Sequence, residues 1–253
     1  MDVTYEVAGI GDPLLLVSGL GQVGKRWRRV VPGLADRYTV VTFDNRETGG
    51  TGPCEDGFTL ADIATDALDL MTSLGYERFF LGGISMGGMI SQEIIRLAPE
   101  RVRAAVLFST HGGAAGSVPP ANPGVIGPQA DGTPTWARLA GPGFFEAHPD
   151  IIEEETALSV ESATQPAGYM RQMQAIQQFD PNAAVRDLGV PIVIGHGDQD
   201  PLVPYENGVR LAKALGVELV TFAGAGHVLE CERVQDVVEL MRRHFTVSSV
   251  RCA

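Results

Sequence analysis

The sequence predicts an α/β fold in which helices cover both faces of a mostly parallel central sheet. Two observations lead to this prediction. Short apolar runs alternate with amphipathic helical segments, and most of the runs are continuous, as strands buried on both faces require. The 253 residues are enough to bury the core of one such domain.

The expected strands and helices follow one another regularly. A first short strand is expected near 4–7, and six apolar runs then predict strands at 14–17, 40–43, 79–81, 104–108, 192–194 and 217–220. Helical spacing predicts helices near 24–36, 59–74, 86–97, 205–215 and 231–245. In a doubly wound sheet of this kind, ligands bind beyond the carboxyl ends of the strands.

The alternation is interrupted once, and the interruption predicts a cap. No strand is expected between Ser109 and Pro191, and residues 112–134 are rich in Gly, Pro and Ala. Two helices are expected later in this segment, one starting near Pro149 and one with an apolar stripe over 169–179. The stripe either lines an apolar pocket or packs the cap onto the core.

These features predict the division of the chain. A core is expected from residues 1–110 and 188–247, with a cap of helices and loops at 111–187, inserted before the strand expected at 192–194. Residues 248–253 are expected to form a C-terminal tail that contains Cys252.

Composition excludes several classes of partner. The net charge is −12, from 19 basic and 31 acidic residues, and no basic run is present, so no nucleic-acid partner is expected. No stretch approaches the roughly 20 apolar residues of a membrane span. Residues 1–6 lack the pattern of a signal peptide, and the three cysteines have no metal-like spacing, which predicts a cytoplasmic protein with reduced thiols. The expected partner is a small-molecule substrate, and the oligomeric state is left open.

Residues 83–87, Gly-Ile-Ser-Met-Gly, form a G-x-S-x-G motif between an apolar strand and a helical segment. A serine on so tight a strand-to-helix turn has a strained backbone and small neighbours, and its hydroxyl is exposed at a helix N-terminus. The alternative is a glycine-rich turn with an incidental serine. The context favours Ser85 as a nucleophile.

A serine hydroxyl needs a base, and the base needs an acid that orients it. His227 follows the strand at 217–220 in a glycine-rich loop and is the expected base. The acid is expected after the strand at 192–194, where Asp200 is preferred to Asp198, because Asp198 is better placed to accept hydrogen bonds within the turn. The other histidines are expected in packing or surface roles: His111, His148, His196 and His244.

An oxyanion needs two backbone N–H donors. Met86 follows the nucleophile and supplies one, and Leu20, in the loop after the strand at 14–17, is the expected second donor, with Gly21 as its alternative. The residues expected to bind substrate are Gly19, Gly21, Tyr169, Met173 and Ile176.

Four stretches together resemble the α/β-hydrolase fold superfamily: 18–21, 83–88, 197–201 and 226–227. The chain order Ser, Asp, His is the order that this family uses. The turn at 43–51 is similar to that of aclacinomycin methylesterase-like hydrolases, and the Ser-Met-Gly-Gly-Met elbow is similar to that of 3-oxoadipate enol-lactonase-like proteins. Two features depart from the family: Ser18 stands where many members have histidine, and one strand stands where the family opens with a hairpin.

The residues and the resemblance predict a serine hydrolase that cleaves an ester, a lactone or a thioester of a small to medium apolar substrate, with no cofactor and no metal. A cyclase or a carbon–carbon bond hydrolase with the same triad is an alternative. A protein that only binds a small apolar ligand is a second alternative. The scaffold hosts many reactions, so the fold does not decide among them.

Overall fold

The computed structural model describes residues 3–54, 56–113, 116–126, 135–162, 164–180 and 183–251. Its centre is a seven-stranded sheet in the order β1-β3-β2-β4-β5-β6-β7, in which β1 runs antiparallel to β3 and all other neighbours are parallel. The strands are β1 (Tyr5–Ala8), β2 (Asp12–Val17), β3 (Tyr38–Phe43), β4 (Phe79–Ile84), β5 (Val102–Phe108), β6 (Ile192–Gly197) and β7 (Glu218–Phe222). The predicted fold class is confirmed.

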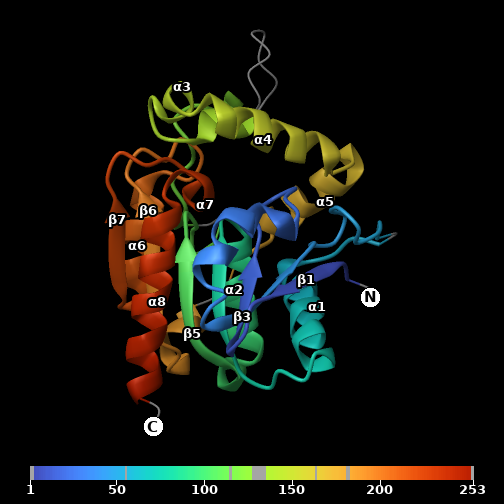
Figure 1. The fold of residues 1–253 in the computed structure, drawn as a ribbon, viewed down its shortest axis with the longest axis vertical. Helices are drawn as coiled ribbons and strands as arrows, with labels where there is room; N and C mark the ends of the chain where they lie inside the picture. The colour runs from blue at the N-terminus through green and yellow to red at the C-terminus, as the bar shows by residue number, and fades with distance from the viewer. Residues whose placement is uncertain are drawn as a thin grey trace.

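Helices pack on both faces of this sheet (Figure 1). The α-helices are α1 (Leu60–Ser73), α2 (Met86–Leu97), α3 (Phe144–Ala147), α4 (Pro149–Glu161), α5 (Pro166–Gln177), α6 (Tyr205–Leu215), α7 (Leu229–Glu232) and α8 (Val234–Arg251). One core layer joins the sheet to α1, α2 and α6, and the other joins it to α7, α8 and the short 3₁₀ helix η1 (Gly24–Arg29).

Strand β2 shows why continuous apolar runs predicted the architecture. Its side chains alternate between the two faces of the sheet. Leu14 and Leu16 contribute to the layer with α8, whereas Leu15 and Val17 contribute to the layer with α1 and α2, and all four are fully buried. Both faces of the strand therefore require apolar residues.

Two segments differ from the prediction. Residues 24–36 form 3₁₀ turns rather than an α-helix, because Pro32 interrupts the backbone hydrogen bonding and Gly24 packs so closely on β3 that a Cβ there would collide with the backbone of Phe43. Residues 248–251, expected in a tail, continue α8, because no proline or glycine stops that helix between 234 and 251. Cys252 lies outside the described residues.

The segment 111–187, expected to be a cap, supplies α3, α4 and α5, which lie over the carboxyl ends of the strands (Figure 1). Its described residues contain no strand, and its division from the core stays a prediction. In the part of the chain that the structure describes, no helix has both the length and the apolar character needed to span a bilayer.

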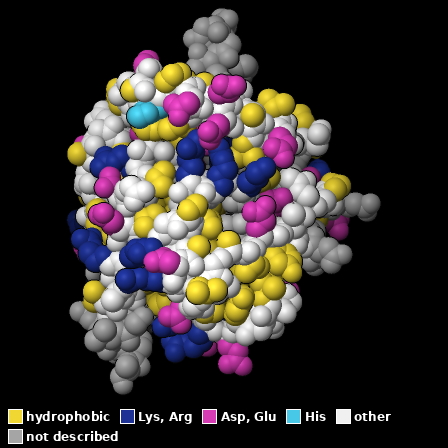
Figure 2. Space-filling view, viewed as in Figure 1, with side chains coloured by type: hydrophobic (Ala, Val, Ile, Leu, Met, Phe, Trp, Pro, Cys, Tyr) yellow, Lys and Arg dark blue, Asp and Glu magenta, His cyan; other side chains and the backbone are white. Residues whose placement is uncertain are grey.

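An ion-pair cluster joins α4 to the core. Glu155 is 3% exposed and forms ion pairs with Arg26, with Arg28 at 2.5 Å and with Arg29 at 3.0 Å, all three on η1. Figure 2 shows basic and acidic side chains gathered on this face, below α4. Buried in this way, the Glu155 carboxylate is balanced by three cations, and it fixes α4 to the segment that follows the loop at 18–22.

Candidate active site

Ser85 lies at the turn between β4 and α2, in a strained backbone conformation. Its φ is 57° and its ψ is −122°, values that residues other than glycine rarely adopt. Gly83 and Gly87 permit the turn, because a Cβ on Gly83 would collide with the carbonyl oxygen of Gly87, and one on Gly87 with that of Val17. The turn places the serine next to β2, where the strand order reverses and ligands of α/β sheets bind.

His227 and Asp200 form a buried hydrogen-bonded pair. The distance from His227 Nδ1 to Asp200 Oδ2 is 2.8 Å, and the two residues are 5% and 7% exposed. The backbone N–H groups of Leu202 and Val203 donate to Asp200 Oδ1 at 2.9 and 2.8 Å, so this carboxylate is fixed from both sides. A carboxylate held against Nδ1 directs Nε2 of the imidazole away from itself.

The charges of this pair shift both pKa values. Burial alone would raise the pKa of Asp200, but the charge of His227 and hydrogen bonds from His196 and His227 lower it to about 2. Burial alone would lower the pKa of His227, but the Asp200 carboxylate raises it above the ordinary 6.5. The carboxylate is thus ionised at neutral pH, and it stabilises a protonated imidazole.

Ser85 and His227 line the same cavity, although the structure contains no hydrogen bond between the Ser85 hydroxyl and the His227 ring. The cavity has a volume of about 620 Å³, and its lining also includes Met89 and Leu139. All five residues predicted to bind substrate lie in this lining: Gly19, Gly21, Tyr169, Met173 and Ile176. Phe179, at the end of the apolar stripe over 169–179, is buried in the core. The stripe therefore both lines the cavity and packs its segment onto the core.

Asp198 and His196 lie beside the pair in different roles. Asp198 Oδ1 accepts a hydrogen bond from the Gly224 N–H at 2.7 Å, as expected for an acid that stabilises a turn. His196 is fully buried, and its Nε2 lies 3.3 Å from Asp200 Oδ2 and 2.8 Å from the Val203 carbonyl oxygen. The sequence predicted only packing for His196, whereas this ring is a second contact of the Asp200 carboxylate.

The two predicted oxyanion donors lie at the expected turns. Met86 begins α2, and neither its N–H nor that of Leu20 donates to another described residue. The N–H of Gly21, the alternative donor, is already engaged by Gln172 Oε1 at 2.8 Å. The geometry therefore favours Leu20 over Gly21 as the second candidate N–H donor to an oxyanion.

Gln172, on α5, was not anticipated from the sequence. It is fully buried, and its Nε2 donates to the Arg46 carbonyl oxygen at 2.7 Å and to Thr48 Oγ1 at 2.8 Å. It therefore ties the loop that carries Leu20 to the turn after β3. A polar residue on an amphipathic helix gives no sequence signal of such a contact.

The loop of His227 is also held by contacts with residues 139–141. The His227 N–H donates to the Leu139 carbonyl oxygen at 2.6 Å. Glu232 accepts from the Gly226 N–H at 2.7 Å and from the Gly141 N–H at 2.8 Å. These bonds fix His227 relative to residues 139–141 without occupying its ring.

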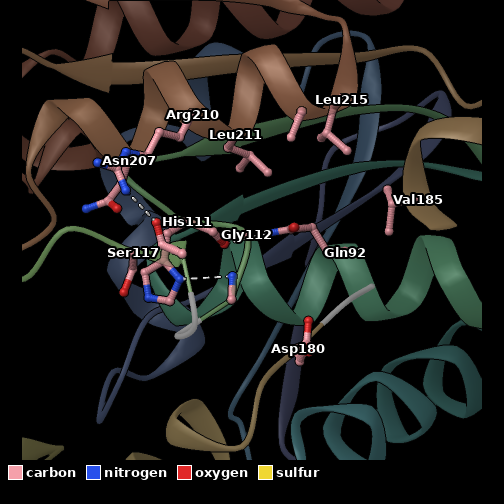
Figure 3. Close-up of a pocket in the computed structure, with 13 residues that line it drawn as sticks. Gln92, His111, Gly112, Ser117, Asp180, Val185, Asn207, Arg210, Leu211 and Leu215 are labelled. Atoms are coloured by element: carbon pink, nitrogen blue, oxygen red, sulfur yellow. Dashed lines mark hydrogen bonds between the residues drawn. The ribbon is translucent and has the colours of Figure 1, made fainter. Parts of the chain in front are cut away.

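A second, smaller cavity of about 330 Å³ adjoins the first, and both have His111 in their linings. Figure 3 shows Arg210 and Leu211 of α6 on one side of it, with Gln92 of α2 and His111 opposite. Burial lowers the pKa of His111 to about 4, and its Nδ1 accepts a hydrogen bond from the Gly113 N–H, which requires that nitrogen to be unprotonated. His111 is therefore a neutral ring at physiological pH, beside two cavities.

Comparison with known proteins shows the family of the chain. Residues 12–232 match the family described as alpha/beta hydrolase fold. A protein of Azorhizobium caulinodans, provisionally named carbamate hydrolase RutD, is 27% identical over 220 residues, which cover 85% of this chain and 83% of that protein. The 3-oxoadipate enol-lactonase 2 of Acinetobacter baylyi is 25% identical over 257 residues, 96% of this chain and 94% of its own length.

Solved structures have the same fold. The enol-lactonase from Burkholderia xenovorans superposes with a TM-score of 0.80 at 23% identity, over 96% of both chains. An esterase from Thermogutta terrifontis superposes with a TM-score of 0.80 at 22% identity, over 97% of this chain and 93% of its own. At these identities the likeness shows the architecture alone.

Proposed function

Because this chain belongs to the alpha/beta hydrolase fold family, we propose that it is a serine hydrolase that cleaves an ester, a lactone or a thioester. The observation that carries the proposal is the buried Asp200–His227 pair, whose His227 lies with Ser85 in the lining of one cavity. Relatives named enol-lactonase and carbamate hydrolase support the assignment, since both names describe cleavage at an acyl carbon.

The proposed first step forms an acyl-enzyme. Ser85 Oγ attacks the substrate carbonyl carbon while His227 Nε2 takes the hydroxyl proton, and Asp200 stabilises the resulting imidazolium. The N–H groups of Leu20 and Met86 bind the oxyanion of the tetrahedral intermediate. The intermediate then collapses, and His227 returns the proton to the departing oxygen or sulfur.

The proposed second step releases the acid. His227 accepts a proton from water, the water oxygen attacks the acyl carbon, and the second tetrahedral intermediate expels Ser85 Oγ, which regains its proton from the imidazolium. The apolar lining supplied by Met89, Tyr169 and Ile176 favours a substrate with hydrocarbon on one side of the scissile bond.

The test combines labelling and kinetics. A fluorophosphonate probe should label Ser85 in the wild type but not in Ser85→Ala, and the variant should lose about 10⁴-fold or more in kcat against p-nitrophenyl esters. Met89→Leu is the matched control, since it changes the lining and leaves the nucleophile. Full activity in Ser85→Ala would exclude covalent catalysis by Ser85. An unlabelled Ser85 in folded protein that also lacks esterase activity would favour a ligand-binding role.

A further inference from the structure

Part of the cavity lining is polar and has no role in the proposed reaction. Four residues, which we call the polar wall, form it: Arg26, Trp136, Ser159 and Glu230. Arg26 contacts two of the others, since its Nη2 donates to Ser159 Oγ at 2.8 Å and its guanidinium lies 5.9 Å from the Trp136 ring centre. Glu230 is in the first turn of α7, three residues after His227.

Two groups of the polar wall lack partners. Glu230 is 4% exposed, and its Oε2 has no hydrogen-bond partner among the described residues. The indole Nε1 of Trp136 is likewise buried and unpartnered within the described part of the chain. Buried polar groups are nearly always hydrogen-bonded, so the unpartnered Glu230 oxygen and the unpartnered Trp136 N–H, on two residues of one cavity lining, are hydrogen-bonding groups that a ligand in this cavity would complete.

The charges around the polar wall disfavour a charged ligand group. An ammonium would lie near the guanidinium of Arg26, and a carboxylate would lie near Glu230. Burial raises the pKa of Glu230 to about 7, although Arg26 opposes this, so the carboxyl group is available near neutral pH both as a donor and as an acceptor. An uncharged group that both donates and accepts meets these conditions, and hydroxyl and carboxamide groups do so.

Building on the serine-hydrolase function proposed above, we propose that the polar wall binds an uncharged hydroxyl or carboxamide group of the substrate, away from the scissile bond. In this arrangement the Trp136 N–H donates to the oxygen of the group, and the Glu230 carboxyl accepts its O–H or N–H. The preferred substrates are then esters, lactones or thioesters that carry such a group, rather than plain hydrocarbon chains.

Matched substrate pairs test this specificity. The probes are p-nitrophenyl esters of rising chain length, each ending either in a hydroxyl group or in a methyl group of the same overall length. We expect the wild type to prefer the hydroxyl-ended member of at least one pair by about 10-fold or more in kcat/KM, because binding a methyl group would leave the polar wall unpaired. Glu230→Leu should bring this ratio to one or below, whereas Glu230→Gln should keep most of it.

Trp136→Phe is the second variant, and it tests the role of the polar wall if Glu230→Leu does not fold. It removes the indole donor, keeps the carboxyl group, and should reduce the ratio several-fold. Using a ratio cancels any general effect on His227. A ratio near one in the wild type for every pair overturns the proposal, as does a ratio that neither variant changes.

The same preparations separate the two proposals. Fluorophosphonate labelling of Ser85 and cleavage of methyl-ended esters report only on the serine-hydrolase function. If both fail in folded protein, the proposed function fails. If both succeed while the ratio stays near one, the polar wall alone is rejected.

Discussion

The Oε1 atom of Gln172 accepts a hydrogen bond from the Gly21 N–H at 2.8 Å, across 151 residues of sequence. The contact joins α5 to the loop that carries Leu20, a proposed oxyanion donor. The same side chain holds the turn after β3 through its Nε2. The position of the loop at 18–22 therefore depends on a residue outside the predicted core.

Replacing Gln172 should slow catalysis more than it weakens binding. In Gln172→Leu the loop loses its anchor, and we expect kcat to fall by about 10-fold, less than the 10²–10³-fold loss of a donor itself, with a smaller change in KM. Steady-state kinetics on a p-nitrophenyl ester measures both. Gln174→Leu, on the exposed side of α5, is the control. An unchanged kcat in Gln172→Leu would show that the loop holds its position without this contact.

Substitution of the two neighbouring aspartates, Asp198 and Asp200, should have very different effects on kcat. Asp200→Asn should lower kcat by about 10⁴-fold, because an amide does not hold the required imidazole tautomer or stabilise its charged form. Asp198→Asn keeps an oxygen for the Gly224 N–H, and its kcat should stay within a few-fold of wild type. Equal losses in the two variants would contradict the assignment of Asp200 as the acid.

Activity should depend on pH through His227. The base must be neutral to accept the serine proton, and its pKa lies above 6.5 in the folded protein. We therefore expect kcat/KM to be low in acid and to rise with pH through a midpoint above 6.5. In Asp200→Asn the carboxylate charge is lost while burial remains, so the residual activity should show a midpoint shifted to lower pH. A shift to higher pH would mean that Asp200 does not set this pKa.

Glu155 should contribute strongly to stability. Its removal in Glu155→Ala leaves Arg26, Arg28 and Arg29 without their shared partner, and we expect a loss of about 3 kcal/mol in the free energy of unfolding. Glu154→Ala removes a more exposed carboxylate that pairs with Arg29 alone, and should cost less than about 1 kcal/mol. Urea denaturation measures both changes. Similar losses in the two variants would refute a special role for the buried carboxylate.

The parts of the structure that were predictable are those that follow from local rules. Leu14–Val17 indicated a buried strand because both of its faces pack on helices, and the glycines around Ser85 indicated a turn too tight for other residues. The preference for Asp200 over Asp198 came from their places in one loop, and the structure puts Asp200 against His227.

What could not be predicted depends on distant contacts. The partners of Gln172 lie more than 120 residues away, and nothing in its own neighbourhood indicates them. His196 is a different case, because it stands only four residues before Asp200 and touches it where the loop after β6 turns back. Glu230 resembles any acidic residue early in a helix, and its burial within a cavity lining appears only after α7 has packed.

The backbone of Ser85 has a consequence for the whole molecule. An L-residue held at φ 57° and ψ −122° destabilises the folded state by about 1–3 kcal/mol. Glycine at this position would avoid most of this strain. Among inactive variants, Ser85→Gly should therefore melt at a higher temperature than Ser85→Ala, which keeps the strain and lacks the hydroxyl. At this position the residue required for activity is not the residue that gives the highest melting temperature. Selection for stability alone would therefore not retain the serine.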